Sequence, residues 1–104
     1  MTAASVPTIR RARPDDATAI AALTEAAYAK YVPIIGRRPV PMDWDYERVV
    51  AEWQVWLAEE AGRLLGVLLL VAEERTLLIE SVAVAPGEQG KGVGRRLLDH
   101  AMFE

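Results

Sequence analysis

Three strand-like segments follow one another in the middle of the chain, separated by two short polar turns. They are residues 53–59, 64–72 and 76–85. The first alternates, with Val55 and Leu57 on one face, and the second is a nearly continuous apolar run, typical of a strand buried on both faces. Gly62 marks the first turn, and the triplet EER marks the second. Turns this short join antiparallel neighbours, so the segments predict a sheet built of hairpins.

One strand and one helix are expected before this sheet. The strand, residues 8–12, is bracketed by prolines and ends in arginines that suit an exposed sheet edge. Asp15 and Asp16 then provide an N-cap and favourable charge at the start of a helix, which ends near Pro33. Apolar and aromatic residues recur at helical spacing along it. They are Ile20, Leu23, Ala27 and Tyr31.

A proline-rich loop and a second short helix are expected next. Residues 32–43 contain three prolines and a glycine, which favour an irregular loop. The loop carries Arg37 and Arg38, either of which could recognise a carboxylate on a ligand or remain solvated. Asp43 or Asp45 then caps a short helix that continues to about residue 52.

A last helix is predicted over residues 92–104, where apolar side chains return to helical spacing. The order of elements is therefore βααβββα, with one strand-to-helix crossover at the end. This order predicts an α+β fold with helices packed on a mixed, mainly antiparallel sheet. At 104 residues and without internal repeats, the chain is expected to form a single domain, 1–104.

Composition argues against several kinds of function. The net charge of −3 argues against a general nucleic-acid binder, which needs a basic excess to neutralise phosphates. The chain has no cysteine and one histidine, His100, so no metal site is expected. The longest apolar run contains Gly66 and is well short of the roughly 20 residues that span a bilayer. Together with the lack of a signal-peptide pattern, this indicates a cytoplasmic protein that does not enter a membrane.

The last strand and the last helix are joined by a glycine-rich turn within SVAVAPGEQGKGVGRRLL. The first N–H groups of a helix lack intrahelical partners and carry partial positive charge, which suits a phosphate. Gly90, Gly92 and Gly94 leave the backbone of the turn accessible. Three cations occur within the same few residues: Lys91, Arg95 and Arg96. The spacing fits neither the P-loop nor the GxGxxG pattern. Alternatively, the glycines serve only the geometry of the turn.

This stretch resembles the acetyl-CoA-binding motif of the GNAT superfamily of N-acetyltransferases. The superfamily pattern Gln/Arg-x-x-Gly-x-Gly/Ala is met by Gln89, Gly92 and Gly94, and the pattern's preceding valine and proline correspond to Val84 and Pro86. The first half of the family fold has the order βααβββα, so the resemblance extends over the whole chain. It implies a GNAT fold that stops after the helix following strand 4, a single incomplete domain over 1–104.

The resemblance also implies roles for residues around the turn. Backbone N–H groups from Gln89 to Gly94, with Arg95 beside them, would hold the pyrophosphate of acetyl-CoA, the cosubstrate. Backbone groups of Val82 and Val84 would bind the pantetheine arm like an added strand and help to polarise the thioester carbonyl. No metal is implied. The implied cofactor-binding residues are Val82, Ala83, Val84, Gln89, Gly90, Lys91, Gly92, Val93, Gly94 and Arg95.

Glu80 is the best candidate for the general base, which is needed because only an unprotonated amine attacks a thioester. It stands four residues before Val84 in an apolar stretch, and strand alternation puts it on the face of Val82. Enclosure by apolar residues would raise the pKa of the carboxyl, which suits a base. Alternatively, Glu80 pairs with an arginine or reaches solvent at a splayed strand edge.

Two functions of different class follow from these observations. In the first, the chain belongs to an enzyme that transfers an acetyl group from acetyl-CoA to a primary amine of a small molecule or peptide, by direct attack in a ternary complex. In the second, it is a non-catalytic CoA-binding module, or a module that forms a homodimer through the bare edge of strand 4. Family members continue with further strands and a helix that often carries the general acid, and the sequence stops before that region.

Overall fold

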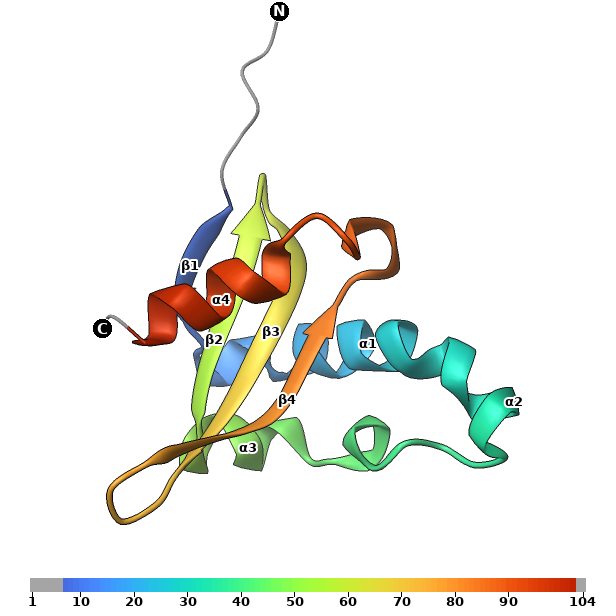
Figure 1. Ribbon diagram of the computed structural model, residues 1–104, viewed down its shortest axis with the longest axis horizontal. Helices are drawn as coiled ribbons and strands as arrows, with labels where there is room; N and C mark the ends of the chain where they lie inside the picture. The colour runs from blue at the N-terminus through green and yellow to red at the C-terminus, as the bar shows by residue number, and fades with distance from the viewer. Residues whose placement is uncertain (1–6, 103–104) are drawn as a thin grey trace, which may run out of the picture.

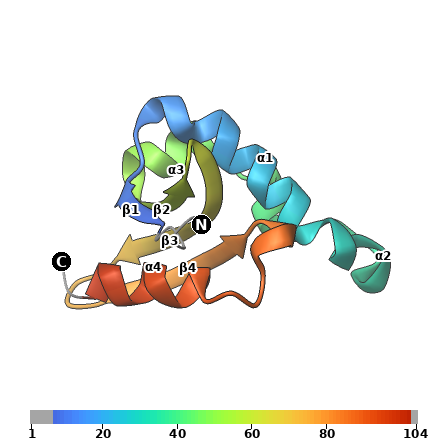
Figure 2. The same cartoon turned by 90° about the horizontal axis from the view of Figure 1, so that it is seen from above.

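A four-stranded antiparallel sheet with helices on both faces forms the body of the protein (Figures 1 and 2). The computed structural model describes residues 7–102. The strands, in their spatial order, are β1 (Thr8–Arg11), β2 (Gln54–Glu60), β3 (Arg63–Ala72) and β4 (Leu77–Val84). The helices are α1 (Ala17–Tyr28), α2 (Val32–Ile35), α3 (Tyr46–Glu52) and α4 (Val93–Met102). The predicted α+β fold and element order are confirmed, with the four-residue helix α2 added within the loop. Residues 103–104 of the predicted last helix lie outside the described residues.

The central strands bury side chains on both faces of the sheet. Helices α1 and α3 cover one face, where Ile20 shares a buried cluster with Val55 and Leu57. Helix α4 covers the other face, where Leu97 shares a second cluster with Trp56. The predicted common face of Val55 and Leu57 is therefore confirmed, while the opposite face of β2 is buried as well. Burying one such side chain contributes roughly 1.5–3 kcal/mol, so both helices are held firmly.

Gly66 in β3 sets how closely α4 approaches the sheet. A Cβ atom at this position would lie 2.9 Å from Cγ1 of Val93 and 3.2 Å from the carbonyl oxygen of Ala83. The first contact is shorter than carbon atoms tolerate, so any larger residue would push the start of α4 away from the sheet. Because Gly66 has no side chain, the start of α4 can pack closely against β3 and β4.

The acidic residues that were expected to cap helices divide into two roles. Asp45 caps α3, because its carboxylate accepts the backbone N–H groups of Glu47 and Arg48. Asp16 makes no side-chain cap to α1. Its carboxylate accepts the N–H of Arg13 and pairs with the guanidinium of Arg10, which lowers the pKa of Asp16 to about 2. Asp16 thus ties the start of α1 to β1.

Helical turns continue past Pro33, contrary to the predicted end of the first helix. A 3-10 turn, Ala29–Tyr31, follows α1, and α2 then includes Pro33 in its first turn. A proline is tolerated there because the N–H groups of a first turn have no intrahelical acceptor. Within residues 7–102, no helix combines the length and apolar character needed to cross a membrane.

Candidate functional site

Strand β4 is an edge strand, and its free edge carries backbone groups of the predicted binding residues. The N–H of Ala85 donates to the carbonyl oxygen of Leu65 on β3, at 2.8 Å. Because backbone groups alternate in direction along a strand, the N–H and C=O groups of Val82 and Val84 point away from β3. The predicted backbone positions for a pantetheine arm therefore lie along an unpaired edge of the described sheet.

Glu80 is the extra residue of a β-bulge in β4. Ser81 pairs with Leu69 and Ile79 pairs with Leu70, so the register skips Glu80. The bulge interrupts the alternation that the sequence predicted. Ile79 lies with Leu70 on the face covered by α4. The side chain of Glu80 is exposed, and the apolar enclosure predicted for it is wrong for the described residues.

The glycines of the turn have different structural roles. The φ angles are +82° at Gly90 and +83° at Gly92, in the left-handed region that costs other residues roughly 1–2 kcal/mol. No atom lies within 4 Å of a Cβ built at either position. Backbone geometry thus accounts for both glycines and leaves open space beside them. At Gly94, by contrast, a Cβ would lie 3.4 Å from Cγ1 of Val82, so this glycine lies where α4 meets β4.

Helix α4 begins directly after Gly92 and presents unpaired donors. The N–H of Arg96 donates to the carbonyl oxygen of Gly92 at 3.0 Å, in the i to i−4 pattern of an α-helix. The preceding N–H groups, at Val93, Gly94 and Arg95, have no acceptor one turn earlier in the helix. Aligned peptide dipoles add partial positive charge at the same place. The free edge of β4 is therefore followed in the chain by a set of N–H groups that can bind an anion.

The side chain of Gln89 connects this turn to two other parts of the protein. Its Nε2 donates to the carbonyl oxygen of Val84 at 3.1 Å, on the free edge of β4. Its Oε1 accepts a hydrogen bond from Nζ of Lys30 at 2.7 Å, although the two residues are 59 positions apart. The motif glutamine is thus held between the end of β4 and the 3-10 turn that follows α1.

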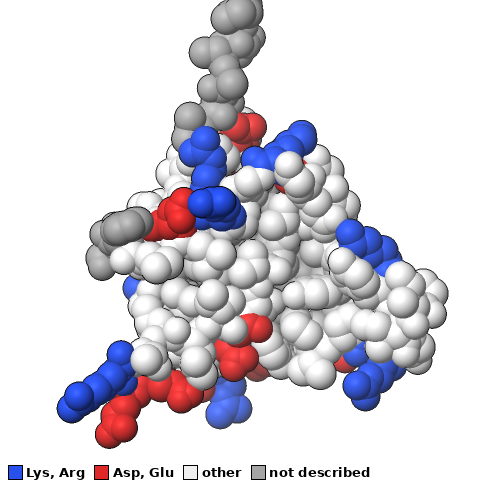
Figure 3. Space-filling model, viewed as in Figure 1, with Lys and Arg blue, Asp and Glu red and all other residues white. Residues whose placement is uncertain are grey.

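The opposite flank of the turn is held by Glu88. Its carboxylate pairs with Arg63 at 2.9 Å and lies 3.8 Å from Nζ of Lys91. Lys91 and Arg96 line a hollow of about 370 Å³ beside the β2–β3 hairpin. On the face seen in Figure 3, basic side chains are dispersed around the rim and form no continuous patch.

The proline-rich loop is fastened to α1 by Arg38 and to α3 by Tyr46. The guanidinium of Arg38 bonds to the carboxylates of Glu25, at 2.7 Å, and Asp43, at 3.0 Å, and this contact lowers the pKa of Glu25. The hydroxyl of Tyr46 donates to the carbonyl oxygen of Pro41, and burial raises the pKa of Tyr46. Arg38 is therefore engaged within the protein and is not a free carboxylate receptor.

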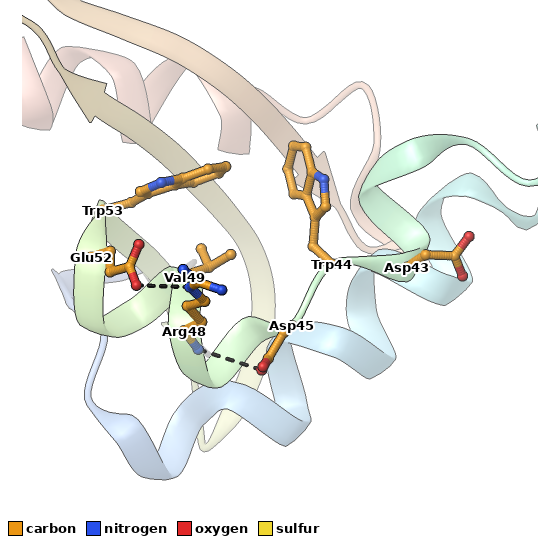
Figure 4. A pocket seen from close by; sticks show the side chains of 7 residues that line it. All are labelled: Asp43, Trp44, Asp45, Arg48, Val49, Glu52 and Trp53. Carbon is orange, nitrogen blue, oxygen red and sulfur yellow. Dashed lines mark hydrogen bonds and ion pairs between the residues drawn. The ribbon is translucent and has the colours of Figure 1, made fainter.

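A pocket of about 330 Å³ lies between this loop, α3 and the start of β2 (Figure 4). Trp44 and Trp53 flank it, with ring centroids 5.1 Å apart in an edge-to-face arrangement. Arg48 and Glu52 form an ion pair on its α3 wall. The third tryptophan, Trp56, lies in the other core cluster, so the three indoles do not share one groove.

A match over most of the chain decides the family. Residues 19–104 match the family model described as the acetyltransferase (GNAT) family. The chain belongs to the GNAT acetyltransferase family. The matched region contains β2, β3, β4 and the whole glycine turn. The resemblance inferred from the motif is thereby confirmed.

Solved GNAT structures resemble this chain in fold. The chain is 25% identical to a GNAT family acetyltransferase from Brucella melitensis in complex with acetyl-CoA, with a TM-score of 0.68 over 94% of this chain and 67% of that one. It is 25% identical to IAA acetyltransferase from Bacillus cereus, with a TM-score of 0.63 over 94% and 57% of the two chains. A PaiA N-acetyltransferase from Thermoplasma acidophilum in complex with coenzyme A reaches a TM-score of 0.81 over 95% and 71%, at 14% identity.

The chain spans only part of these relatives, 57% of the length of the Bacillus cereus protein. At 14% identity, the likeness to the Thermoplasma acidophilum protein concerns the fold alone. The sequence matches no curated protein.

The structure brings most of the predicted GNAT site residues together along one path. The free edge at Val82 and Val84 leads through Gln89 and the positive-φ glycines to the start of α4. The contact of Lys30 with Gln89 was not predicted, because nothing in the local sequence distinguishes Lys30 from a solvated lysine at the end of a helix. Among the described residues, no group of three or more acidic or histidine side chains could hold a metal ion.

Proposed function

We propose that this chain carries the acetyl-CoA-binding part of an N-acetyltransferase that acts on a primary amine of a small molecule or peptide. The observation that carries the proposal is a path of backbone groups that do not pair within the sheet or the helix, although the carbonyl oxygen of Val84 accepts Nε2 of Gln89. It runs from the outward-facing edge at Val82 and Val84 to the N–H groups at the start of α4. CoA presents groups in the same order, an extended arm with two amides that ends in a diphosphate. The GNAT family match and the acetyl-CoA complex of the Brucella melitensis relative support this assignment.

In the proposed complex, the pantetheine arm adds to β4 as a further strand. Its amides exchange hydrogen bonds with the backbone of Val82 and Val84, and the diphosphate meets the N–H groups at residues 93–95. The open space beside Gly90 and Gly92 lets phosphate oxygens approach the backbone. Arg95, exposed in the first turn of α4, adds a cation at the same end.

The proposed reaction is direct attack of the amine on the thioester. A C–N bond forms while the carbonyl electrons move onto oxygen, and collapse of this intermediate breaks the C–S bond and releases CoA thiolate. The ammonium proton passes to a base, and the thiolate takes up a proton. A fixed N–H donor stabilises the charge that develops on the carbonyl oxygen, and we assign this role to Val82.

We assign the base to Glu80. The bulge interrupts the regular side-chain alternation of β4 at Glu80, two residues before Val82. Its exposure allows the carboxylate to accept a proton from an approaching amine, directly or through one water molecule. Glu80 is therefore assigned as the base because of its position in the bulged strand, without apolar enclosure of its carboxylate.

A non-catalytic module that pairs through β4 is the second candidate. Three apolar side chains at the start of this edge strand are exposed: Leu77, Leu78 and Ile79. An open strand edge with exposed apolar side chains can pair with another chain, including a second copy of this one. This candidate predicts self-association that increases with protein concentration and does not depend on acetyl-CoA.

Titration calorimetry with acetyl-CoA tests the first proposal. Gly92→Ala is the informative variant, because it adds a methyl group where φ is +83° and disturbs the turn. Gly36→Ala is the matched control, since Gly36 has the same φ, is equally open and lies in the proline-rich loop. We expect Gly92→Ala to weaken binding at least about tenfold and Gly36→Ala to change it less than about twofold.

Absence of binding by the parent chain at millimolar acetyl-CoA would contradict the proposal. Equal weakening by both variants would indicate a general loss of stability, which a thermal unfolding curve detects independently. Acetyl transfer is then scored by mass spectrometry of a primary-amine panel. A mass gain of one acetyl group on an amine, together with release of free CoA thiol, is the expected result.

A further inference from the structure

The cations around the glycine turn lie on two different flanks. Lys91 and Arg96 line the hollow beside the β2–β3 hairpin, together with the carboxylates of Glu60 and Glu88. Glu88 also pairs with Arg63 from that hairpin. The basic side chains on this flank are therefore partly neutralised by acidic neighbours, and they lie away from the free edge of β4.

Lys30 lies on the other flank, next to the free edge. Figure 2 shows the turn after β4 beside the end of α1, and Lys30 belongs to the 3-10 turn at that end. Its ammonium donates to Oε1 of Gln89, whose Nε2 donates to the outward-facing carbonyl oxygen of Val84. Lys30, Gln89 and Val84 thus form a hydrogen-bonded chain that ends on the edge proposed for the pantetheine arm.

The ammonium of Lys30 has the donors needed to meet a phosphate from this position. It carries three N–H donors, of which Gln89 accepts one, and the ammonium also lies 5.2 Å from the centroid of the Tyr31 ring. A phosphate can accept a further N–H from it. In the proposed complex the pantetheine arm lies along the free edge at Val84, next to Gln89, and Lys30 contacts Gln89. Among the described lysines and arginines, Lys30 is the one that hydrogen-bonds to the motif glutamine.

We propose that Lys30 is a further cofactor-binding residue, whose ammonium contacts the diphosphate of CoA. This inference rests on the proposed function, because it takes the path of the pantetheine arm from it. Lys30 precedes the glycine turn by some sixty residues, so the contact also joins the end of α1 to the bound cofactor. The proline-rich loop that follows the 3-10 turn of Lys30 is thereby linked to the glycine turn.

Calorimetry with three probes tests the contact: CoA, dephospho-CoA and pantetheine. Lys30→Met removes the charge and keeps most of the stem, Lys30→Arg retains a cation, and Arg75→Met is a charge-matched control in the β3–β4 turn. We expect Lys30→Met to weaken CoA and dephospho-CoA equally, about five- to tenfold, and to leave pantetheine unchanged. Lys30→Arg is expected to bind within about threefold of the parent, and Arg75→Met within about twofold.

The remaining outcomes overturn the inference in distinguishable ways. Equal weakening of pantetheine assigns Lys30 a purely structural role through Gln89. Weakening of CoA but not of dephospho-CoA assigns Lys30 to the 3′-phosphate instead of the diphosphate. If Lys30→Met binds CoA as tightly as the parent chain does, Lys30 is excluded as a cofactor-binding residue, and the proposed function is unaffected. A parent chain that binds none of the three probes contradicts the proposed function itself, and the inference with it.

Discussion

The hydroxyl of Tyr28, at the end of α1, lies 3.1 Å from Oγ of Ser81, the residue that follows the bulge in β4. Ser81 is buried, with 8% of its surface exposed. The contact therefore links α1 to the strand at the point where Glu80 leaves the regular register. A buried hydroxyl that loses its partner is destabilising, so this contact has a measurable effect.

Tyr28→Phe should lower the free energy of unfolding by about 1 kcal/mol, because it leaves Oγ of Ser81 without the phenolic partner. Chemical unfolding followed by circular dichroism measures the change. Tyr31→Phe is the matched control, since Tyr31 is 39% exposed and neighbours Tyr28. A loss for Tyr28→Phe no larger than that for Tyr31→Phe would show that the contact does not stabilise the fold.

Gly66→Ala should destabilise the protein by about 1–3 kcal/mol, because the new methyl group meets Val93 and the backbone of Ala83. The start of α4 must then shift, so acetyl-CoA affinity should fall as well. Gly87→Ala is the control, because a Cβ there meets no atom within 4 Å. Thermal unfolding of both variants checks the prediction, and an unchanged melting temperature for Gly66→Ala would contradict the close seating of α4.

Acid should remove a stabilising contribution from Asp16. Its pKa is lowered to about 2 in the folded protein by the hydrogen bonds from Arg10 and Arg13. A lowered folded-state pKa stabilises the protein above the unfolded pKa, and the effect disappears as the pH falls through the folded pKa. Allowing for screening at a partly solvated site, we expect Asp16→Asn to cost about 1 kcal/mol at pH 7 and only a small part of that near pH 2.

Urea unfolding of the parent chain and Asp16→Asn at both pH values checks this dependence. Asp15→Asn provides the control, because Asp15 is an exposed neighbour on the same 3-10 turn. A difference between parent and Asp16→Asn that stays constant from pH 7 to pH 2 would contradict the ion pair with Arg10 as its source.

Glu80→Gln should lower the rate of acetyl transfer by about a hundredfold or more and flatten the acidic limb of the pH–rate profile. The amide keeps the size of the side chain but cannot accept the proton of the amine. The rate is measured on the shortest version of the protein that transfers the acetyl group of acetyl-CoA to an amine. A variant with the parent's pH–rate profile would exclude Glu80 as the base, while an unchanged affinity for acetyl-CoA is expected.

Features that depend on local sequence were predicted well. The apolar run of β3 and the turn at Gly62 are encoded within a few residues, and so is the strand-to-helix turn after β4. The positive φ angles at Gly90 and Gly92 agree with the alternative in which these glycines serve the geometry of the turn, because few other residues adopt a positive φ.

Features that depend on pairing between distant segments were not predicted. The bulge at Glu80 arises from the register between β3 and β4, and neither glycine nor proline marks it in the sequence. For that reason the regular alternation and the apolar enclosure predicted for Glu80 do not hold. Lys30 precedes Gln89 by 59 positions, and their contact depends on how α1 packs against the sheet. The expected cap at Asp16 gave way to an ion pair with Arg10, and only the folded chain reveals how close these two side chains lie.

An amide chemical-shift titration with acetyl-CoA tests the central claim most directly, because it reports on each backbone N–H of the chain. We predict that the largest shifts occur at Val82 and Val84 and across residues 89–95, with small shifts on the remote β3–β4 turn at 73–75. Large shifts confined to other segments, or none at millimolar acetyl-CoA, would contradict the claim that the free β4 edge and the start of α4 together hold the cofactor.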